Sequence, residues 1–293
     1  MKATLLTIIF TSLFVGSSFA QTPRKATNAY RNEGYKLVWS DEFSKDGRPD
    51  ARKWSYEKGF ERNHEAQYYQ RENCWCEDGM LIFEARKERR VSFEYNPTPT
   101  WWDQKALYAD YTSASINTRG KFTFTYGRLE VRAKIPVSKG AWPAIWLLGT
   151  TNSWPHCGEI DVMEYYHIKG EPHILANAAW GGRKAGDAIW DDIKIPFSYF
   201  TALDKDWADK FHIWRMDWDS TSIRIYVDDT LLNEIPAWKS INLGGKSEGV
   251  NPFSREHFIL LNLALGGDNG GPIDDSALPL RYEVDYVRVY QQK

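Results

Sequence analysis

The sequence lacks an excess of basic residues. Its 293 residues contain 37 Lys and Arg against 39 Asp and Glu, which gives a formal net charge of −2. Proteins that bind nucleic acids neutralise phosphates with clustered Lys and Arg. The charge balance therefore predicts no nucleic-acid partner.

Cysteine is also scarce. The chain has three, Cys74, Cys76 and Cys157, and no Cys/His spacing typical of a metal site accompanies them. In an exported protein an odd number leaves at least one thiol unpaired. The sequence favours buried, unpaired thiols, and it leaves open whether Cys157 pairs with one of the other two.

Long hydrophobic runs are missing beyond the N-terminus. Residues 5–15 are largely apolar, Lys2 precedes them, and residues 18–20 fit a small-x-small cleavage site, which together predict a signal peptide over 1–20. The run is too short to cross a bilayer, and a buried N-terminal helix is the alternative interpretation. We therefore expect a secreted or periplasmic protein without a membrane partner, with a flexible lead-in over 21–35 and a single domain over 36–293.

Aromatic residues, in contrast, are abundant. They make up 15% of the chain and include 14 Trp and 16 Tyr. The apolar faces of sugar rings stack on aromatic side chains, so a saccharide-binding cleft is a natural use for this surplus.

Short segments of alternating polarity, separated by turn residues, predict an all-β fold of the sandwich type. Two long stretches without a clear period, 87–110 and 183–210, are expected to be loops, the second with one helical turn. The expected strands, apart from the acidic stretch described next, cover 35–43, 80–85, 111–118, 123–136, 140–149, 173–182, 211–218, 222–227, 258–267 and 282–290.

Three carboxylates occur within six residues of one predicted strand, as Glu159, Asp161 and Glu164. Side chains alternate along a strand, so a β-bulge at Val162–Met163 is needed to return Glu164 to the face of the other two acids. Two carboxylates ~5.5 Å apart repel each other by roughly 3 kcal/mol at an effective dielectric of ~20. Retaining glycoside hydrolysis uses such a pair, one as nucleophile and one as acid/base. A Ca²⁺ or Mg²⁺ site, or a strand with acids on its wet face, are the alternatives.

The run GEIDVME closely resembles the active-site strand of glycoside hydrolase family 16 in its β-bulge form. Further similar runs, such as VWSDEF, FTYGRLEVRAKIP and GAWPAIWLLG, extend the resemblance over about residues 36–291. It implies a β-jelly-roll sandwich of two curved antiparallel sheets with a concave substrate cleft. It also implies Glu159 as nucleophile, Glu164 as general acid/base and Asp161 as the auxiliary acid beside the nucleophile.

The same resemblance suggests residues that bind substrate. The segment NHEAQYY is similar to one that borders the glycone side of the cleft, and Ala179 stands where many laminarinases have a histidine, which puts a strict laminarinase assignment in doubt. Arg128 could instead form an ion pair with an acid of the sheet. Of the two Trp residues on the expected strand 140–149, one could belong to the core and not to the cleft. The candidates are Asn63, Glu65, Arg128, Trp142, Trp146, Trp180 and Asn262.

We expect an endo-acting retaining hydrolase that cleaves β-1,3/1,4-glucans, either mixed-linkage β-glucan or laminarin. The alternatives are a non-catalytic glycan-binding protein on the same fold and an enzyme acting on an algal galactan such as agarose. The resemblance implies no cofactor for catalysis, and it implies a structural calcium ion at Glu42 and Asp285, away from the cleft. The expected partner is a polysaccharide and the expected state is a monomer.

Overall fold

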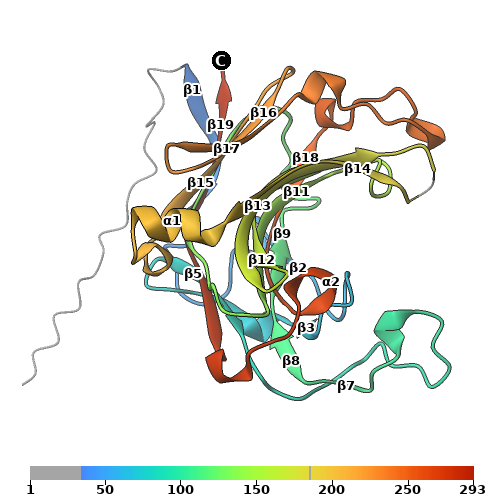
Figure 1. The fold of residues 1–293 in the computed structure, drawn as a ribbon, viewed down its shortest axis with the longest axis vertical. Helices are drawn as coiled ribbons and strands as arrows, with labels where there is room; N and C mark the ends of the chain where they lie inside the picture. Colours follow the sequence, from blue (N-terminus) through green and yellow to red (C-terminus); the bar gives the residue numbers. More distant parts are fainter. Residues whose placement is uncertain (1–33, 185) are drawn as a thin grey trace, which may run out of the picture.

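The computed structural model describes residues 34–184 and 186–293. The predicted signal peptide and the lead-in up to residue 33 lie outside the described residues. Two large antiparallel sheets are stacked face to face (Figure 1), so the predicted all-β sandwich is confirmed. No helix in the described part of the chain is long and apolar enough to span a membrane.

The sheet that carries the acids curves around a cavity, and we call it the cleft sheet (Figure 1). Its strands lie in the order β14 (Ala188–Pro196), β13 (Glu171–Gly181), β12 (Glu159–Ile168), β11 (Ala141–Gly149), β18 (His257–Leu265), β9 (Ser115–Asn117) and β2 (Ser55–Tyr56).

The second sheet packs against the back of the first, and we call it the rear sheet. Its strands lie in the order β17 (Thr230–Ile235), β16 (Ile223–Val227), β15 (His212–Trp218), β10 (Gly127–Lys134), β19 (Leu280–Gln292), β5 (Met80–Ala85) and β4 (Cys74–Glu77), with β1 (Tyr35–Asp41) also paired to β19.

Short elements connect the two sheets. β3 (Gln67–Tyr69) pairs in parallel with β8 (Tyr111–Ser113), and β6 (Arg90–Val91) pairs with β7 (Tyr108–Ala109). The α-helices are α1 (Phe197–Leu203) and α2 (Gly267–Gly270), and the 3-10 turns are η2 (Arg71–Asn73), η3 (Trp102–Gln104), η4 (Trp207–Asp209), η5 (Ala237–Lys239), η6 (Gly245–Ser247), η7 (Pro252–Ser254) and η8 (Asp275–Ala277).

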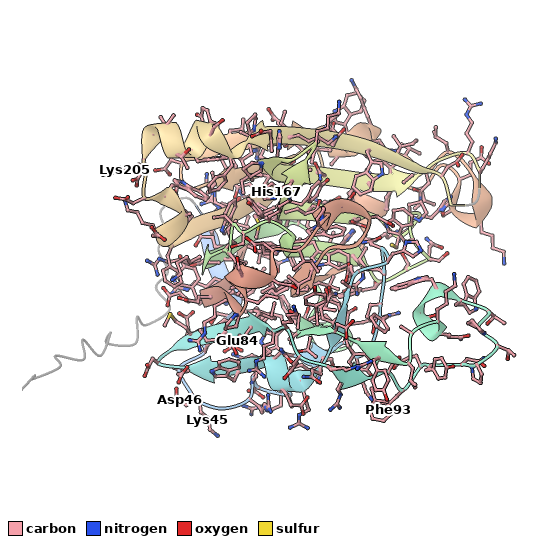
Figure 2. The ribbon with its side chains drawn as sticks, turned by 60° about the horizontal axis from the view of Figure 1, so that its bottom comes forward. Lys45, Asp46, Glu84, Phe93, His167 and Lys205 are labelled. Atoms are coloured by element: carbon pink, nitrogen blue, oxygen red, sulfur yellow. The ribbon has the colours of Figure 1, made fainter. Side chains whose placement is uncertain are left out.

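The predicted loop over 87–110 is largely irregular, as expected. Only the β6–β7 pair and η3 interrupt it among its described residues, and Phe93 lies on it at the outside of the molecule (Figure 2). The predicted loop over 183–210 is wrong for nine residues, which form the edge strand β14, but the helical turn expected within it is confirmed by α1. The predicted strand over 111–118 is divided at Ala114 into β8 and β9.

The main hydrophobic core lies between the two sheets. Leu129, Val131 and Ala133 alternate along β10 and are fully buried, as the sequence predicts for one face of this strand. Ile145 and Leu147 on β11 meet them from the cleft sheet. At roughly 25 cal/mol per Å² of buried apolar surface, this layer is the main favourable contribution to the stability of the fold.

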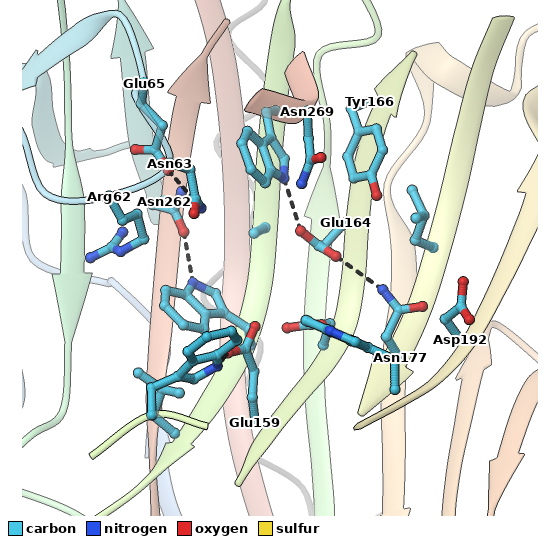
Figure 3. A pocket seen from close by; sticks show the side chains of 18 of the residues that line it. Arg62, Asn63, Glu65, Glu159, Glu164, Tyr166, Asn177, Asp192, Asn262 and Asn269 are labelled. Atoms are coloured by element: carbon cyan, nitrogen blue, oxygen red, sulfur yellow. Dashed lines mark hydrogen bonds between the residues drawn. The ribbon is translucent and has the colours of Figure 1, made fainter. Parts of the chain in front are cut away.

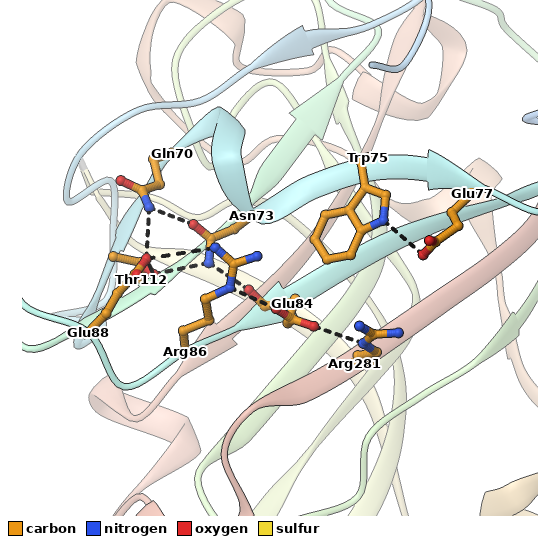
Figure 4. A network of polar contacts seen from close by, with 9 residues as sticks. All are labelled: Gln70, Asn73, Trp75, Glu77, Glu84, Arg86, Glu88, Thr112 and Arg281. Atoms are coloured by element: carbon orange, nitrogen blue, oxygen red, sulfur yellow. Dashed lines mark hydrogen bonds and ion pairs between the residues drawn. The ribbon is translucent and has the colours of Figure 1, made fainter. Parts of the chain in front are cut away.

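The outer face of the rear sheet carries paired charges. Glu84 on β5 accepts hydrogen bonds from Arg86 at 2.7 Å and from Arg281 of β19 at 2.8 Å (Figure 4). Cys74, Cys76 and Cys157 are buried and unpaired, as the sequence favours.

Candidate active site

The three acids meet on one face of β12. Regular pairing of β12 with β13 is interrupted between Asp161 and Glu164, and pairing with β11 shifts at the same place. This is the β-bulge that the acid spacing predicts. As a result Glu159, Asp161 and Glu164 all line one cavity of about 780 Å³ (Figure 3).

Glu164 lies between an indole and an amide. The Nε1–H of Trp142 donates to its Oε1 at 2.9 Å, and the Nδ2 of Asn177 donates to its Oε2 at 3.1 Å. Burial raises the pKa of Glu164 to about 7, since these two hydrogen bonds favour the charged form less than burial and the charge of Glu159 oppose it. Glu164 is therefore suited to exchange a proton near neutral pH.

Glu159 and Asp161 behave as a coupled pair. Burial raises the pKa of both, and the pKa of Asp161 rises further because it faces the charges of Glu159 and Glu164. The Nε1–H of Trp154 donates to Glu159 and favours its ionised form. The pKa of Asp161 is thus raised further than that of Glu159, which favours Glu159 as the ionised member of the pair.

A polar group of residues forms one end of the cavity. Glu65 is 3% exposed, and Gln67 Nε2 and Tyr69 Oη donate to its Oε2 at 2.7 and 3.1 Å. Asn63 and Asn262 also line the cavity (Figure 3), so the predicted positions of Asn63, Glu65 and Asn262 are in the cleft.

Backbone pairing places this group beside the cleft sheet. The N–H of Ala66 donates to the carbonyl oxygen of Leu265 at 2.9 Å, and the N–H of Asp268 donates to the carbonyl oxygen of Asn63 at 2.8 Å. A Cβ at Gly267, whose φ is +69°, would lie 2.6 Å from the carbonyl oxygen of Asn63. Only glycine fits this approach, so the turn after β18 fixes the 63–66 segment against the cavity.

Trp142 and Trp146 of β11 both line the cavity, and Trp146 also packs in a small buried cluster with Ala144, Phe258 and Leu260. The Nε1–H of Trp146 donates to Oδ1 of Asn262 at 2.7 Å, and the guanidinium of Arg62 lies 5.1 Å from the centre of a Trp146 ring. Both indoles are thus held in fixed orientations beside the acids.

Two predicted binding residues are not in the cleft. Arg128 belongs to β10 of the rear sheet, where its Nε lies 2.6 Å from Asp217, so the ion-pair alternative holds and the glycone contact is wrong. Trp180 packs against Phe253 and the core between the sheets. Because neighbours along a strand face opposite ways, it is Ala179 of β13, and not Trp180, that shares the face of Asn177.

The predicted calcium ligands each face an arginine. Glu42 lies 2.7 Å from Arg288, and Asp285 lies 2.6 Å from Arg132. Across residues 34–184 and 186–293, no group of three or more His, Cys, Asp or Glu side chains is arranged to hold a metal ion. Carboxylates already neutralised by arginine do not fit a calcium site, and the predicted ion has no support from these contacts.

Several residues that line the cavity were not predicted from the sequence. Asn177 was recoverable, because it lies two residues before Ala179 on an expected strand. Residues of β14 were not, because that segment was interpreted as a loop. The additional lining residues are Arg62, Ala144, Leu148, Trp154, Tyr166, Leu175, Asn177, Trp190, Asp192, Lys194 and Asn269.

Comparisons with known proteins agree with this geometry. The family model described as glycosyl hydrolases family 16 matches residues 64–245. The chain is 34% identical to a beta-glucanase from Rhodothermus marinus, over 97% of this chain and 94% of the relative.

Two solved structures have the same fold. The laminarinase catalytic domain from Thermotoga maritima is 34% identical with a TM-score of 0.71, covering 88% of this chain and 99% of that one. A protein described with the endo-acting O-glycanases that members of the human gut microbiota express to initiate mucin breakdown is also 34% identical, with a TM-score of 0.76, covering 89% of this chain and 92% of that one. Sequence match, shared fold and the acid-bearing bulged strand together establish that the chain belongs to glycosyl hydrolases family 16.

Proposed function

We propose that this protein is an endo-acting retaining glycoside hydrolase that cleaves β-1,3/1,4-glucans. The observation that carries the proposal is the bulged strand β12, which gathers three acids, Asp161 buried and Glu159 and Glu164 partly buried, in a cavity lined by indoles and amides. Burial and mutual repulsion of these acids oppose folding, and binding a glycan does not require them. A purely glycan-binding role is therefore the weaker explanation.

The proposed first step is attack by an ionised Glu159 oxygen on the anomeric carbon. The bond from that carbon to the departing oxygen breaks, and Glu164 donates its proton to that oxygen. Glu164, now a carboxylate, then takes a proton from water, whose oxygen displaces Glu159 from the anomeric carbon. Asp161 lies beside the nucleophile, and its raised pKa suits it to share a proton with Glu159 between turnovers.

Each proton and charge in this scheme belongs to an acid of the cleft. We therefore expect catalysis without a cofactor and unchanged turnover after treatment with a metal chelator. A turnover that falls with chelation and returns with added Ca²⁺ would contradict this expectation.

The charges of the cavity favour a neutral polysaccharide. Both cations that line it are paired, Arg62 with Glu57 and Lys194 with Asp192. A sulfated chain needs cations that can turn toward it. Together with the β-glucanase and laminarinase relatives, this favours a glucan.

A mucin O-glycan, or a galactan such as agarose, is the second candidate. The O-glycanase structure has a TM-score of 0.76, against 0.71 for the Thermotoga laminarinase at the same identity of 34%. Ala179 on the cleft face also departs from the histidine that many laminarinases have there.

The test is product analysis of purified residues 21–293 on mixed-linkage β-glucan, laminarin, agarose, xyloglucan and mucin O-glycans. Rapid release of oligosaccharides from mixed-linkage glucan or laminarin, with the β-anomer formed first, supports the proposal. Release from agarose or mucin glycans alone keeps the acid roles and replaces the substrate. A folded protein that cleaves none of the five contradicts a hydrolytic function.

We also propose that the protein is exported and acts as a monomer. A polymer too large to cross a membrane requires an enzyme outside the cytoplasm, and residues 1–20 have the pattern of a signal peptide. The mass of the mature protein should correspond to a start at Gln21, and light scattering should give the mass of one chain. An uncleaved N-terminus in a cytoplasmic fraction would contradict the proposed export.

A further inference from the structure

The edge strand β14 extends the floor of the cleft beyond the acids. Side chains two apart on a strand share a face, and Trp190, Asp192 and Lys194 all line the cavity. They lie directly across from Ala179, Asn177 and Leu175 of β13, respectively. Figure 3 shows Asp192 on the far side of Asn177 from Glu164.

Trp190 is linked to the acids through a single small residue. Ala179 is the cross-strand neighbour of Glu159 on one side and of Trp190 on the other. Adjacent strands are about 4.8 Å apart, so the backbones of Trp190 and Glu159 lie about 10 Å apart across the sheet. This is the range of a sugar next to the one that Glu159 attacks.

Ala179 and Trp190 are a small and a large side chain directly opposite each other on β13 and β14. Although Ala179 faces the cleft, it is fully buried, whereas its neighbour Trp190 is 43% exposed. The Cβ atoms of residues directly opposite each other on a sheet lie about 4.5–5.5 Å apart, so the side chain at position 179 is within reach of the Trp190 indole. A bulkier residue at 179 would occupy the space into which the indole extends.

The two ends of the cavity differ in how firmly their polar side chains are held. Glu65 and Asn262, at the end opposite β14, are 3% and 4% exposed and hydrogen-bonded within the protein. Such fixed polar groups suit the sugar that stays on the enzyme during the covalent step. The leaving group must depart and be replaced by water, which suits the exposed side chains of β14.

We infer that Trp190 is the stacking platform for the sugar on the leaving-group side, and that Ala179 makes this platform possible. The indole binds the apolar face of a neutral pyranose, and the Asp192–Lys194 pair beside it offers hydrogen bonds to hydroxyls. This inference rests on the proposed function, because it names a specificity residue of the same cleft.

The test compares two substrates that share their glycone. The first is the polymer that the enzyme cleaves best, and the second is a β-glycosyl fluoride of its disaccharide, whose leaving group is one atom and needs no sugar platform. Trp190→Ala should lower kcat/KM on the polymer about tenfold and leave kcat/KM on the fluoride unchanged. Trp190→Phe should recover most of the loss, and Ala179→Leu, which crowds the indole, should resemble Trp190→Ala.

A matched control is Trp238→Ala. Trp238 is 60% exposed and does not line the cavity, so both substrates should be cleaved as by the unaltered protein. Equal losses on polymer and fluoride in Trp190→Ala would overturn the inference, since they would indicate general damage or a role on the glycone side. An unchanged rate on the polymer would also overturn it. If the unaltered protein cleaves neither substrate, the proposed function fails instead, and the two failures are distinguishable.

Discussion

Buried glutamates of the two sheets have opposite surroundings. Glu84 of the rear sheet and Glu164 of the cleft sheet are both removed from water, which by itself raises a carboxyl pKa. Hydrogen bonds from Arg86 and Arg281 outweigh burial and lower the pKa of Glu84 (Figure 4). Glu164 has an indole and an amide in place of the arginines, and its pKa rises to about 7.

The same contrast holds across the two sheets. Carboxylates of the rear sheet are matched by arginines, as in the pairs Asp217–Arg128 and Asp285–Arg132. The acids of β12 face one another and uncharged hydrogen-bond donors. Pairing an acid with arginine stabilises the fold and fixes its charge, whereas an acid without such a partner costs stability and keeps a proton that can be transferred.

The largest expected effect is on the acids of the cleft. Glu164→Gln should lower kcat by about 10²–10⁴-fold, because the general acid is lost, and Glu159→Gln should lower it at least as much, because no covalent intermediate forms. Both variants should unfold at the same or a higher temperature than the unaltered protein. Steady-state kinetics with calorimetry checks both parts, and a variant with normal turnover would contradict the assignment.

The next largest effect is a loss of stability without a loss of activity, and it is expected in the rear sheet. Arg128→Ala leaves Asp217 buried without its main partner and should lower the free energy of unfolding by about 3–5 kcal/mol. Turnover per folded molecule should stay unchanged, since Arg128 lies outside the cleft. Urea denaturation and active-site titration measure the two quantities, and a specific loss of turnover at normal stability would restore Arg128 as a substrate contact.

The two glutamates should also give opposite pH dependences of stability. Glu164 binds a proton more tightly in the folded state than at its unfolded pKa of about 4.3, so its contribution is present below that value and is lost as pH rises through about 7. Glu84 contributes above its unfolded pKa, and its contribution is lost as pH falls through its lowered folded pKa. Melting temperatures measured across pH 3–9 check this. Glu164→Gln should lack the fall in stability toward high pH, and Glu84→Gln should lack the fall toward low pH.

The activity should also depend on the protonation of Glu164. Because Glu164 acts as the acid, kcat/KM should fall as pH rises above about 7. A pH–rate profile with no alkaline limb near this value would show that another group supplies the proton.

The smallest expected effect is a shift of the pH–rate profile, which should distinguish the two Trp residues of β11. Trp142→Phe removes the donor to Glu164 and should move the alkaline limb upward by about one to two pH units, since a hydrogen bond to a charged group is worth about 1.5–3 kcal/mol. Trp146→Phe removes a donor to Asn262 and should leave the limb in place. Equal shifts in the two variants would indicate that the hydrogen bond to Glu164 is not what tunes its pKa.

The parts of the site that were predictable from sequence depend on local spacing. The positions of Glu159, Asp161 and Glu164 require the bulge, because without it Glu164 would point into the core. Strand periodicity likewise places Trp142 and Trp146 on one face.

The parts that were not predictable depend on strand pairing. No local signal indicates that the strand with Arg128 joins the rear sheet, and β14 was missed because Asp191 and Asp192 interrupt the apolar pattern of an edge strand. Trp190 enters the cleft only through the pairing of β14 with β13.

The most direct test of the central claim is to trap the covalent intermediate. A 2-deoxy-2-fluoro β-glycosyl fluoride of the preferred glycone slows the second step, so intact mass spectrometry should show one added glycosyl unit, and peptide mapping should place it on Glu159. A label on Glu164, or full turnover of the reagent-treated protein without any label, would contradict the division of roles between the acids of β12.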